Sequence, residues 1–384
     1  MKKLVIIGAS YLQLPLVKKA RELNLETHVF AWKDGAVAEE IADYFYPISI
    51  IEKEKILAEC KKINPDGITS IASDLAMLTV SYIAKELDLV GNSLICTQNA
   101  RNKYLMRKQF LKNGIKCPKF VKVLENCNFD IKGLKFPLIV KPADSSGSRG
   151  INKVDSKEKI NEAIDNAIYY SLSREVIIEE FIEGEEVSVE TISFSGKHYY
   201  LTITDKETTG SPHFVETSHH QPSMYIPRLE CRIKELAFRG LFALGFKNGA
   251  AHTEIKITPN AELYIIETGG RMGGDLIGSD LVKLSTGYDF VKGVIEVALG
   301  EFNIPKIDKN MFSGVHYVYP RTKGIVNKII DTTGDYTIIT NKELVLQIGD
   351  KVKPISKSID RKGFYVYNDS KKLEDRDLIK LIIK

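Results

Sequence analysis

The chain has 384 residues, of which 43% are hydrophobic and 27% charged. These proportions are ordinary for folded proteins and exclude a fibrous or wholly disordered chain, and the length suits roughly two to four domains of about 150 residues. The 54 basic and 50 acidic residues leave a net charge of only +4, which excludes the dense basic surface of a nucleic-acid-binding protein. We therefore expect small-molecule partners and no nucleic acid.

The cysteines and the apolar segments give expectations about compartment. The five cysteines include no Cys-x-x-Cys pair, a pattern typical of reduced thiols rather than of disulfides or a zinc site. Polar residues interrupt the short apolar run at the N-terminus, so we expect no secretory leader. No segment approaches the about 18 apolar residues of a membrane-spanning helix. We predict a cytoplasmic protein with no membrane partner.

Residues 1–95 have the pattern of a doubly wound α/β domain. KLVIIGASYLQLPLVKKARELNLETHVFAW predicts a buried strand, a glycine turn, an amphipathic helix and a second strand. DGITSIA predicts a further parallel strand, and Ser73 is placed to cap the helix DLAMLTVSYIAKELDL. The turn at Gly8 lacks the second and third glycines of a dinucleotide fingerprint, so support for a nicotinamide or flavin site there is weak.

A connector and a glycine-containing loop follow. Residues 96–117 predict a basic helix, TQNARNKYLMRKQFLKNG, that ends at Gly114, and residues 118–312 predict an α+β lobe or a pair of lobes. In PLIVKPADSSGSRG an apolar strand ends in Lys141 and leads into a loop of small residues. Backbone N–H groups of such a loop, together with the lysine charge, suit a phosphate chain. A flexible surface loop is the alternative.

The stretch VIIEEFIEGEEVSVE predicts a strand that ends in acids, a turn at Gly184 and a second, alternating strand. Acids beside a strand edge can accept hydrogen bonds from an adenine amino group and from ribose hydroxyls. An acidic solvated turn is the alternative.

The stretch HTEIKITPNAELYIIETGGRMGGD predicts a hairpin folded about its Pro-Asn pair. In that register Glu254 and Glu267 are diagonal neighbours on one face, about 7 Å apart. Two carboxylates at this spacing, with no cysteine nearby, favour Mg²⁺ over zinc. A salt-bridge network with Lys256 and Arg271 is the alternative.

Residues 313–384 predict a small β-rich domain. Its short β runs include GVHYVYP, YTIIT and GFYVYND, and the segment KKLEDRDLIKLIIK predicts a closing helix.

Taken in this order, these motifs resemble the ATP-grasp superfamily of carboxylate-amine ligases, and the resemblance extends over essentially the whole chain. It implies a pre-ATP-grasp domain at 1–95, the connector, a small lobe with a phosphate lid at 118–185, a large lobe at 186–312 and a C-terminal β domain at 313–384. The residues that the resemblance assigns to ATP are Lys103, Lys141, Ser145, Ser146, Gly147, Ser148, Glu179, Glu180, Ile182 and Glu186. It assigns Mg²⁺, with Mn²⁺ as an alternative, to Glu254 and Glu267, and catalysis to Arg271, His219 and Lys141.

One segment narrows the resemblance. ETSHHQP is similar to the E-x-x-H-x-x-P motif of bacterial L-amino-acid ligases, with His219 at the motif histidine; a solvent-exposed loop histidine is the alternative. Two departures concern the substrate: Thr268 to Gly270 stand where relatives have asparagine and proline, and Asp275 stands where some dipeptide ligases have tryptophan.

The resemblance implies an ATP-dependent ligase that forms an amide through an acyl phosphate, with an amino acid among its carboxylate and amine substrates. The alternatives are a purine-biosynthesis ligase, a biotin-independent carboxylase, or a regulatory protein that binds ATP without turnover. Family habit implies a homodimer.

Overall fold

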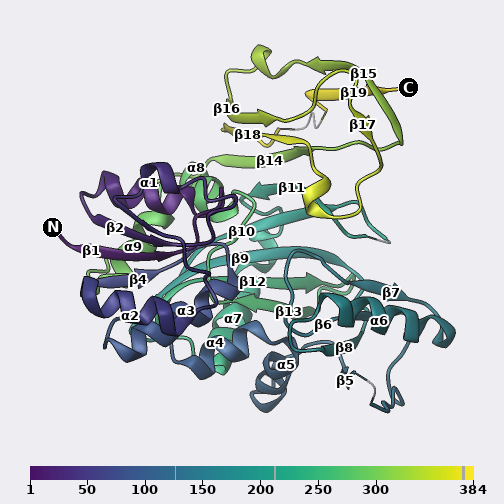
Figure 1. Cartoon of the computed structure of the whole chain (residues 1–384). Helices are drawn as coiled ribbons and strands as arrows, with labels where there is room; N and C mark the ends of the chain where they lie inside the picture. The colour runs from purple at the N-terminus through teal and green to yellow at the C-terminus, as the bar shows by residue number, and fades with distance from the viewer. Residues whose placement is uncertain (126, 212, 374–376) are drawn as a thin grey trace.

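The computed structural model describes residues 1–125, 127–211, 213–373 and 377–384, and within them the strands form four sheets (Figure 1). The mixed α/β and α+β architecture predicted from the sequence is confirmed. In the described part of the chain no helix combines the length and the apolar character needed to cross a membrane.

The N-terminal domain is built on a parallel four-stranded sheet in the order β3-β2-β1-β4. Its elements are β1 (Lys3–Ile7), α1 (Leu14–Glu22), β2 (Glu26–Phe30), β3 (Tyr44–Tyr46), α2 (Lys53–Ile63), β4 (Gly67–Thr69) and α3 (Asp74–Glu86). The central strand β1 forms because four consecutive apolar residues are buried on both faces of the sheet. Ser73 caps α3 as predicted, since its hydroxyl accepts a hydrogen bond from the Ala76 N–H at 3.3 Å.

The connector is two helices, so the prediction of one basic helix is wrong. They are α4 (Leu94–Arg101) and α5 (Lys103–Lys112). Asn102 between them adopts an extended conformation, and its side chain accepts from the Leu105 N–H at 3.1 Å. Asparagine breaks the run because its side chain competes for backbone donors and favours a cap.

The small lobe is an antiparallel sheet in the order β5-β8-β6-β7, with one helix packed on it (Figure 1). Its elements are β5 (Phe120–Leu124), β6 (Leu138–Pro142), β7 (Asn152–Val154), α6 (Ile160–Tyr170) and β8 (Glu175–Glu180). The loop of residues 145–150 joins β6 to β7, as predicted, and thus opens at the end of the strand that carries Lys141.

The large sheet has eight strands in the order β13-β12-β9-β10-β11-β14-β18-β16. Its strands are β9 (Glu185–Phe194), β10 (Lys197–Thr208), β11 (Glu216–Gln221), β12 (Gly249–Ile257), β13 (Leu263–Gly269), β14 (Phe312–Val318), β16 (Ile339–Leu344) and β18 (Gly363–Asp369). The amphipathic helix α7 (Ile226–Leu244) packs on it through Ile233 and Ala237. Helix α9 (Phe290–Ala298) contacts both this sheet and β4, and so joins it to the N-terminal domain.

The C-terminal residues are continuous with this sheet, because β14, β18 and β16 extend it beyond β11. The remaining strands β15 (Gly324–Asp331), β17 (Lys351–Val352) and β19 (Ile379–Ile383) form a three-stranded sheet. The predicted closing helix at KKLEDRDLIKLIIK is wrong for its described end, where Ile379–Ile383 form β19, antiparallel to β15; residues 374–376 lie outside the described residues. Burial of Leu378 and Ile379 in this small core outweighs the helical propensity of the segment. The predicted domain boundaries stay predictions.

Candidate active site

The hairpin β12–β13 places Glu254 directly opposite Glu267, and the diagonal register predicted from the sequence is wrong. A bulge between Glu254 and Ile255 shifts the pairing. The turn is also longer than predicted: Ala261 is left-handed, with φ +56°, and its N–H donates to the Thr258 carbonyl at 2.8 Å. The two carboxylates therefore share one face, with 21% and 23% of their side-chain surface exposed.

Lys103 joins the connector, the loop after β6 and the hairpin. Its Nζ donates to the Ser145 carbonyl at 2.8 Å and to Glu267 Oε1 at 3.1 Å. Its own N–H donates to the Ala143 carbonyl at 2.8 Å, which fixes the start of α5 against the end of β6. The predicted nucleotide lysine and one predicted metal carboxylate are thus in contact.

Lys141 is buried beside Glu179, whose carboxylate lies 2.6 Å from its Nζ. Burial lowers the pKa of Lys141 in spite of this partner. The other oxygen of Glu179 lies 2.7 Å from Nε of Arg107. Arg107 was missed by sequence reasoning, although it lies four residues after Lys103 on the same helix face.

The other residues predicted to contact ATP lie along the small lobe and the first residues of β9. Glu180 accepts from the Lys135 N–H at 3.0 Å, and Ile182 is half-buried. In the loop, Gly147 and Ser148 are consecutive left-handed residues, with φ +70° and +56°. The loop residues Ser145, Ser146, Gly147, Ser148 and Arg149 are partly or fully exposed, whereas Gly150 is buried.

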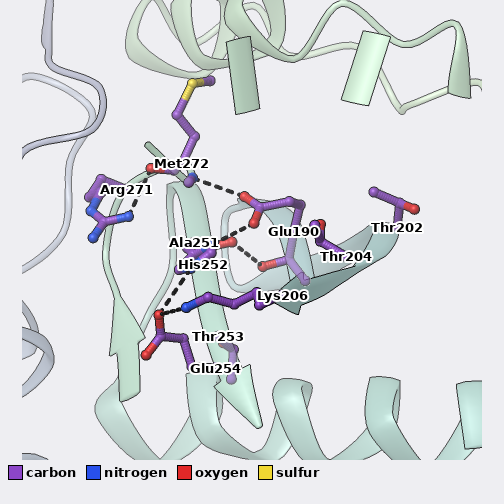
Figure 2. A network of polar contacts seen from close by, with 12 residues as sticks. Glu190, Thr202, Thr204, Lys206, Ala251, His252, Thr253, Glu254, Arg271 and Met272 are labelled. Carbon is purple, nitrogen blue, oxygen red and sulfur yellow. Dashed lines mark hydrogen bonds and ion pairs between the residues drawn. The ribbon is translucent and has the colours of Figure 1, made fainter. Parts of the chain in front are cut away.

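Glu254 is held by two buried cations, Lys206 and His252 (Figure 2). Lys206 Nζ lies 2.5 Å and His252 Nε2 lies 3.5 Å from the same oxygen, Oε1. Burial opposes the charge of Glu254, but the attraction of Lys206 outweighs it and holds the pKa well below the usual range. The predicted alternative, a network with Lys256 and Arg271, is not the one formed by the described residues, whose contacts to Glu254 and Glu267 come from other cations.

His252 connects Glu254 to the loop that follows β13. Its Nδ1 contacts the fully buried Glu190 (Figure 2). The second oxygen of Glu190 accepts from the Gly273 N–H at 3.0 Å. Burial disfavours a charged ring, but Glu190 outweighs it and raises the pKa of His252 to about 9. A Cβ at position 273 would lie 2.9 Å from the His252 ring, so glycine is required there.

Arg271 is paired with Asp74, the first residue of α3 in the N-terminal domain. Its Nε and Nη2 donate to the two oxygens of Asp74 at 3.2 and 3.1 Å. A Cβ on Gly269, two residues before Arg271, would lie 3.0 Å from the Asp74 carboxylate, so a side chain there would crowd the Arg271–Asp74 pair. No sequence pattern pointed to Asp74, because 197 residues separate it from Arg271.

His219 lies on β11 with 1% of its surface exposed, so its interpretation as a solvent-exposed loop histidine is wrong. Burial lowers its pKa to about 3, and the ring is neutral at neutral pH. Among the described residues neither ring nitrogen has a hydrogen-bond partner. Buried polar atoms are normally paired, so the two nitrogens of His219 are an exception among the buried side chains of this site.

Asp275 is held by a residue of the C-terminal segment. Arg361 donates to both of its oxygens at 2.8 and 2.9 Å, and the guanidinium lies 3.9 Å from the ring centre of Tyr317. The Tyr317 hydroxyl donates to the Asp275 carbonyl at 2.9 Å. Asp275 itself is left-handed, with φ +51°. The pair braces the turn that follows Arg271.

The donor set fits a hard divalent cation that binds together with phosphates. Glu254 and Glu267 offer carboxylate oxygens on one face, and Lys103 stands beside the phosphate-loop candidate. Within the described residues no group of three or more His, Cys, Asp or Glu side chains is arranged to hold a metal ion alone. Mg²⁺ commonly takes one or two carboxylates and completes its shell with phosphate oxygens and water.

Residues 134–280 match the model of the ATP-grasp domain. The chain is 29% identical over 302 residues to alanine–anticapsin ligase of Bacillus subtilis (strain 168), an alignment covering 69% of this chain and 63% of that protein. It is 24% identical over 331 residues to carnosine synthase 1 of Homo sapiens, covering 78% of this chain and 40% of that one. The chain thus spans less than two thirds of the length of either relative.

Two solved structures share the fold. An L-amino acid ligase from Bacillus licheniformis superposes with a TM-score of 0.85 at 23% identity, covering 100% of this chain and 99% of that one. A phosphoribosylglycinamide synthetase from Anaerococcus prevotii gives a TM-score of 0.79 at 23% identity, covering 100% of both chains.

Proposed function

We propose that this chain, which belongs to the ATP-grasp superfamily by its domain at residues 134–280, is an ATP-dependent carboxylate-amine ligase with an amino acid among its substrates. One observation carries the proposal: Lys103 bridges the loop after β6 and Glu267, which stands opposite Glu254. Phosphate-binding donors and cation-binding carboxylates thus meet at one place. The names of the relatives, an alanine ligase and an L-amino acid ligase, support the substrate class.

The proposed reaction has two steps. A substrate carboxylate oxygen attacks the γ-phosphorus of ATP, the bond to the bridging oxygen breaks, and an acyl phosphate and ADP result. The nitrogen of an amine then attacks the acyl carbon and phosphate leaves with the bonding electrons; the amine loses a proton and an amide remains. Catalysis of the first step is mainly positioning and charge neutralisation.

The side chains divide this work by position. Lys103 and Lys141 neutralise phosphate charge at the end of β6, and Glu254 and Glu267 would hold Mg²⁺ or Mn²⁺, which neutralises the phosphates when bound. Arg271, oriented by Asp74, would stabilise charge on the acyl oxygen and transferring phosphoryl group.

His219 would act as a neutral group. With a pKa of about 3 it carries no charge at neutral pH, so its role is to accept or donate a hydrogen bond at the acyl phosphate rather than to supply a positive charge. The other proposed ATP contacts are Ser145, Ser146, Gly147, Ser148, Glu179, Glu180, Ile182 and Glu186. Glu179 would act through Lys141, its direct partner.

The test is phosphate release from ATP and Mg²⁺ across amino acids in pairs, polyamines, bicarbonate and aminoimidazole ribonucleotide. We expect release only when a carboxylate and an amine are both present, with at least one an amino acid. Release with bicarbonate or the ribonucleotide alone would identify a carboxylase or purine-type ligase, and no release would leave ATP binding without turnover. Sedimentation of the same protein tests the proposed homodimer.

Two variants examine the assignment of residues. Loss of an electrostatic donor costs about 3 kcal/mol, so Arg271→Met should slow phosphate release by about a hundredfold or more. Glu267→Gln should abolish the magnesium dependence as well as the rate. Full activity of Glu267→Gln would show that the metal assignment is wrong. Lys33→Met, which changes an exposed lysine of the N-terminal domain, is the control.

A further inference from the structure

Lys206 is a buried cation that none of the predicted roles includes. It lies on β10 with 4% of its side-chain surface exposed. Its Nζ is 2.5 Å from Glu254 Oε1, 2.8 Å from Glu186 Oε1 and 3.5 Å from Glu216 Oε1. One ammonium group thus contacts three carboxylates that belong to three different strands.

The sheet order explains why these groups meet. Strand β10 lies between β9 and β11, and β12 pairs with the other side of β9. Lys206 stands directly opposite Glu186 on β9, and Glu254 of β12 projects onto the same face. Without the ammonium group the three carboxylates would repel one another, because they carry like charges at short range. Buried charges that lose a partner are also strongly unfavourable.

Both predicted metal carboxylates are neutralised by lysine in the same way. Lys103 contacts Glu267 Oε1, and Lys206 contacts Glu254 Oε1. A divalent cation that approached Glu254 would meet an ammonium group already on this carboxylate. Phosphate oxygens are alternative partners for ammonium groups, and they also supply cation ligands.

We propose that Lys206 is an internal counter-cation of the metal site: it holds the charge of Glu254, Glu186 and Glu216 while no nucleotide is bound, so that the divalent cation enters only together with nucleotide phosphates. The inference rests on the proposed function, because it takes Glu254 as a metal ligand. Lys206 is then a positioning residue that sets the order in which metal and nucleotide bind.

The test measures Mn²⁺ binding to the nucleotide-free protein, from the electron paramagnetic resonance signal of free Mn²⁺. The natural chain should bind Mn²⁺ weakly alone and at least tenfold more tightly with ADP. Lys206→Met should bind Mn²⁺ without nucleotide at least tenfold more tightly than the natural chain, because the three carboxylates lose the ammonium group they share, and only His252 beside Glu254 and Lys256 beside Glu186 remain. Lys206→Arg, which keeps the charge, should behave as the natural chain.

Two further variants make the result specific. Lys206→Met combined with Glu216→Gln should lose most of the gain, since one of the three acids is removed. Lys19→Met removes a lysine that pairs with Glu22 and Asp289 outside the site and should leave Mn²⁺ binding unchanged. Bound Mn²⁺ should also raise the thermal unfolding temperature of Lys206→Met without nucleotide, because a ligand of the folded state stabilises it.

Two outcomes would overturn the inference: tight nucleotide-independent Mn²⁺ binding by the natural chain, or no gain in folded Lys206→Met. Mn²⁺ binding by the natural chain can be measured without any variant. The inference can therefore be refuted even if Lys206→Met does not fold. Neither measurement requires turnover. A failed phosphate-release assay with the expected Mn²⁺ pattern would refute the proposed reaction alone, and the reverse pattern would refute only the role of Lys206.

Discussion

Two buried lysines of this protein stand in opposite surroundings. In the small lobe Lys141 contacts Glu179, which also contacts Arg107, and burial lowers the pKa of Lys141. In the large sheet Lys206 contacts three acids, and although burial works against its charge, their attraction raises its pKa well above the usual value. In the first region two cations contact one acid, and in the second region three acids contact one shared ammonium group, with His252 and Lys256 beside two of those acids. A nucleotide phosphate chain complements the first, and a divalent cation complements the second.

Glu179→Gln gives the largest expected effect, because it removes the one acid between two buried cations. Breaking a buried ion pair by removing one partner costs about 3–5 kcal/mol, and Arg107 and Lys141 would then face each other uncompensated. We expect the free energy of unfolding in urea to fall by that order, and ATP or tripolyphosphate to restore part of it. Equal stability with and without tripolyphosphate would contradict a positive surplus in this lobe.

The acid-rich region should show itself in the pH dependence of stability. The pKa of His252 is raised to about 9 from an unfolded value near 6.5, so its contribution is full below pH 6.5 and is lost as pH rises through 9. At about 1.36 kcal/mol per pKa unit the loss is up to about 3 kcal/mol. Urea unfolding between pH 6 and 10 measures it.

His252→Gln should flatten this pH profile. His28→Gln is the matched control, because His28 is also buried and lies 2.8 Å from a glutamate, Glu26, but far from the hairpin in the N-terminal sheet. The assignment to His252 fails if both variants keep the slope of the natural chain.

Lys141→Met should weaken nucleotide binding with a smaller energetic effect. A hydrogen bond to a charged group contributes about 1.5–3 kcal/mol, so the affinity for ADP should fall about 10- to 100-fold in isothermal titration calorimetry. Lys132→Met is the control, because Lys132 lies in the same lobe with 93% of its side chain exposed. An unchanged dissociation constant would remove Lys141 from the nucleotide site.

Glu262→Gln should have the smallest effect, since it breaks an ion pair outside both regions. Lys116 and Glu262 are 2.7 Å apart at the hairpin turn, with 60% and 48% of their side chains exposed. Solvent-exposed pairs contribute little because water and salt screen them. We expect no measurable change in thermal unfolding or in phosphate release, and a clear loss of either would mean that the turn takes part in the site.

The sequence was sufficient where the information was local. The strand before Lys141, the acids around Gly184 and the hairpin at Glu254 depend on alternation and on turn residues within a few positions, and the structure has each of these elements. The break in the connector could also have been predicted locally, because Asn102 is an asparagine that caps a new helix. These elements can be predicted from sequence because neighbouring residues determine them.

The sequence was insufficient to predict contacts between residues that are far apart along the chain. Asp74 contacts Arg271 only in the folded chain. Lys206 has no distinguishing sequence pattern, because the acids that contact it belong to the separate strands β9, β11 and β12. At the bulge beside Glu254, the Ile266 carbonyl likewise accepts a hydrogen bond from a distant residue, Arg107, at 2.6 Å. In the C-terminal segment, pairing with β15 overrides local propensity and makes β19 a strand.

The bond between Asp275 and Arg361 has a consequence for protein engineering. The turn after Arg271 is buttressed by a residue of the loop before β18, and β14 and β18 continue the sheet that carries the site. A chimera that exchanged the C-terminal segment with that of a relative would therefore replace a residue that holds the turn after Arg271, and a fragment cut before β14 would leave β11 as an open edge prone to aggregation. Recombination of this chain with its relatives should treat the C-terminal strands and the turn as one unit.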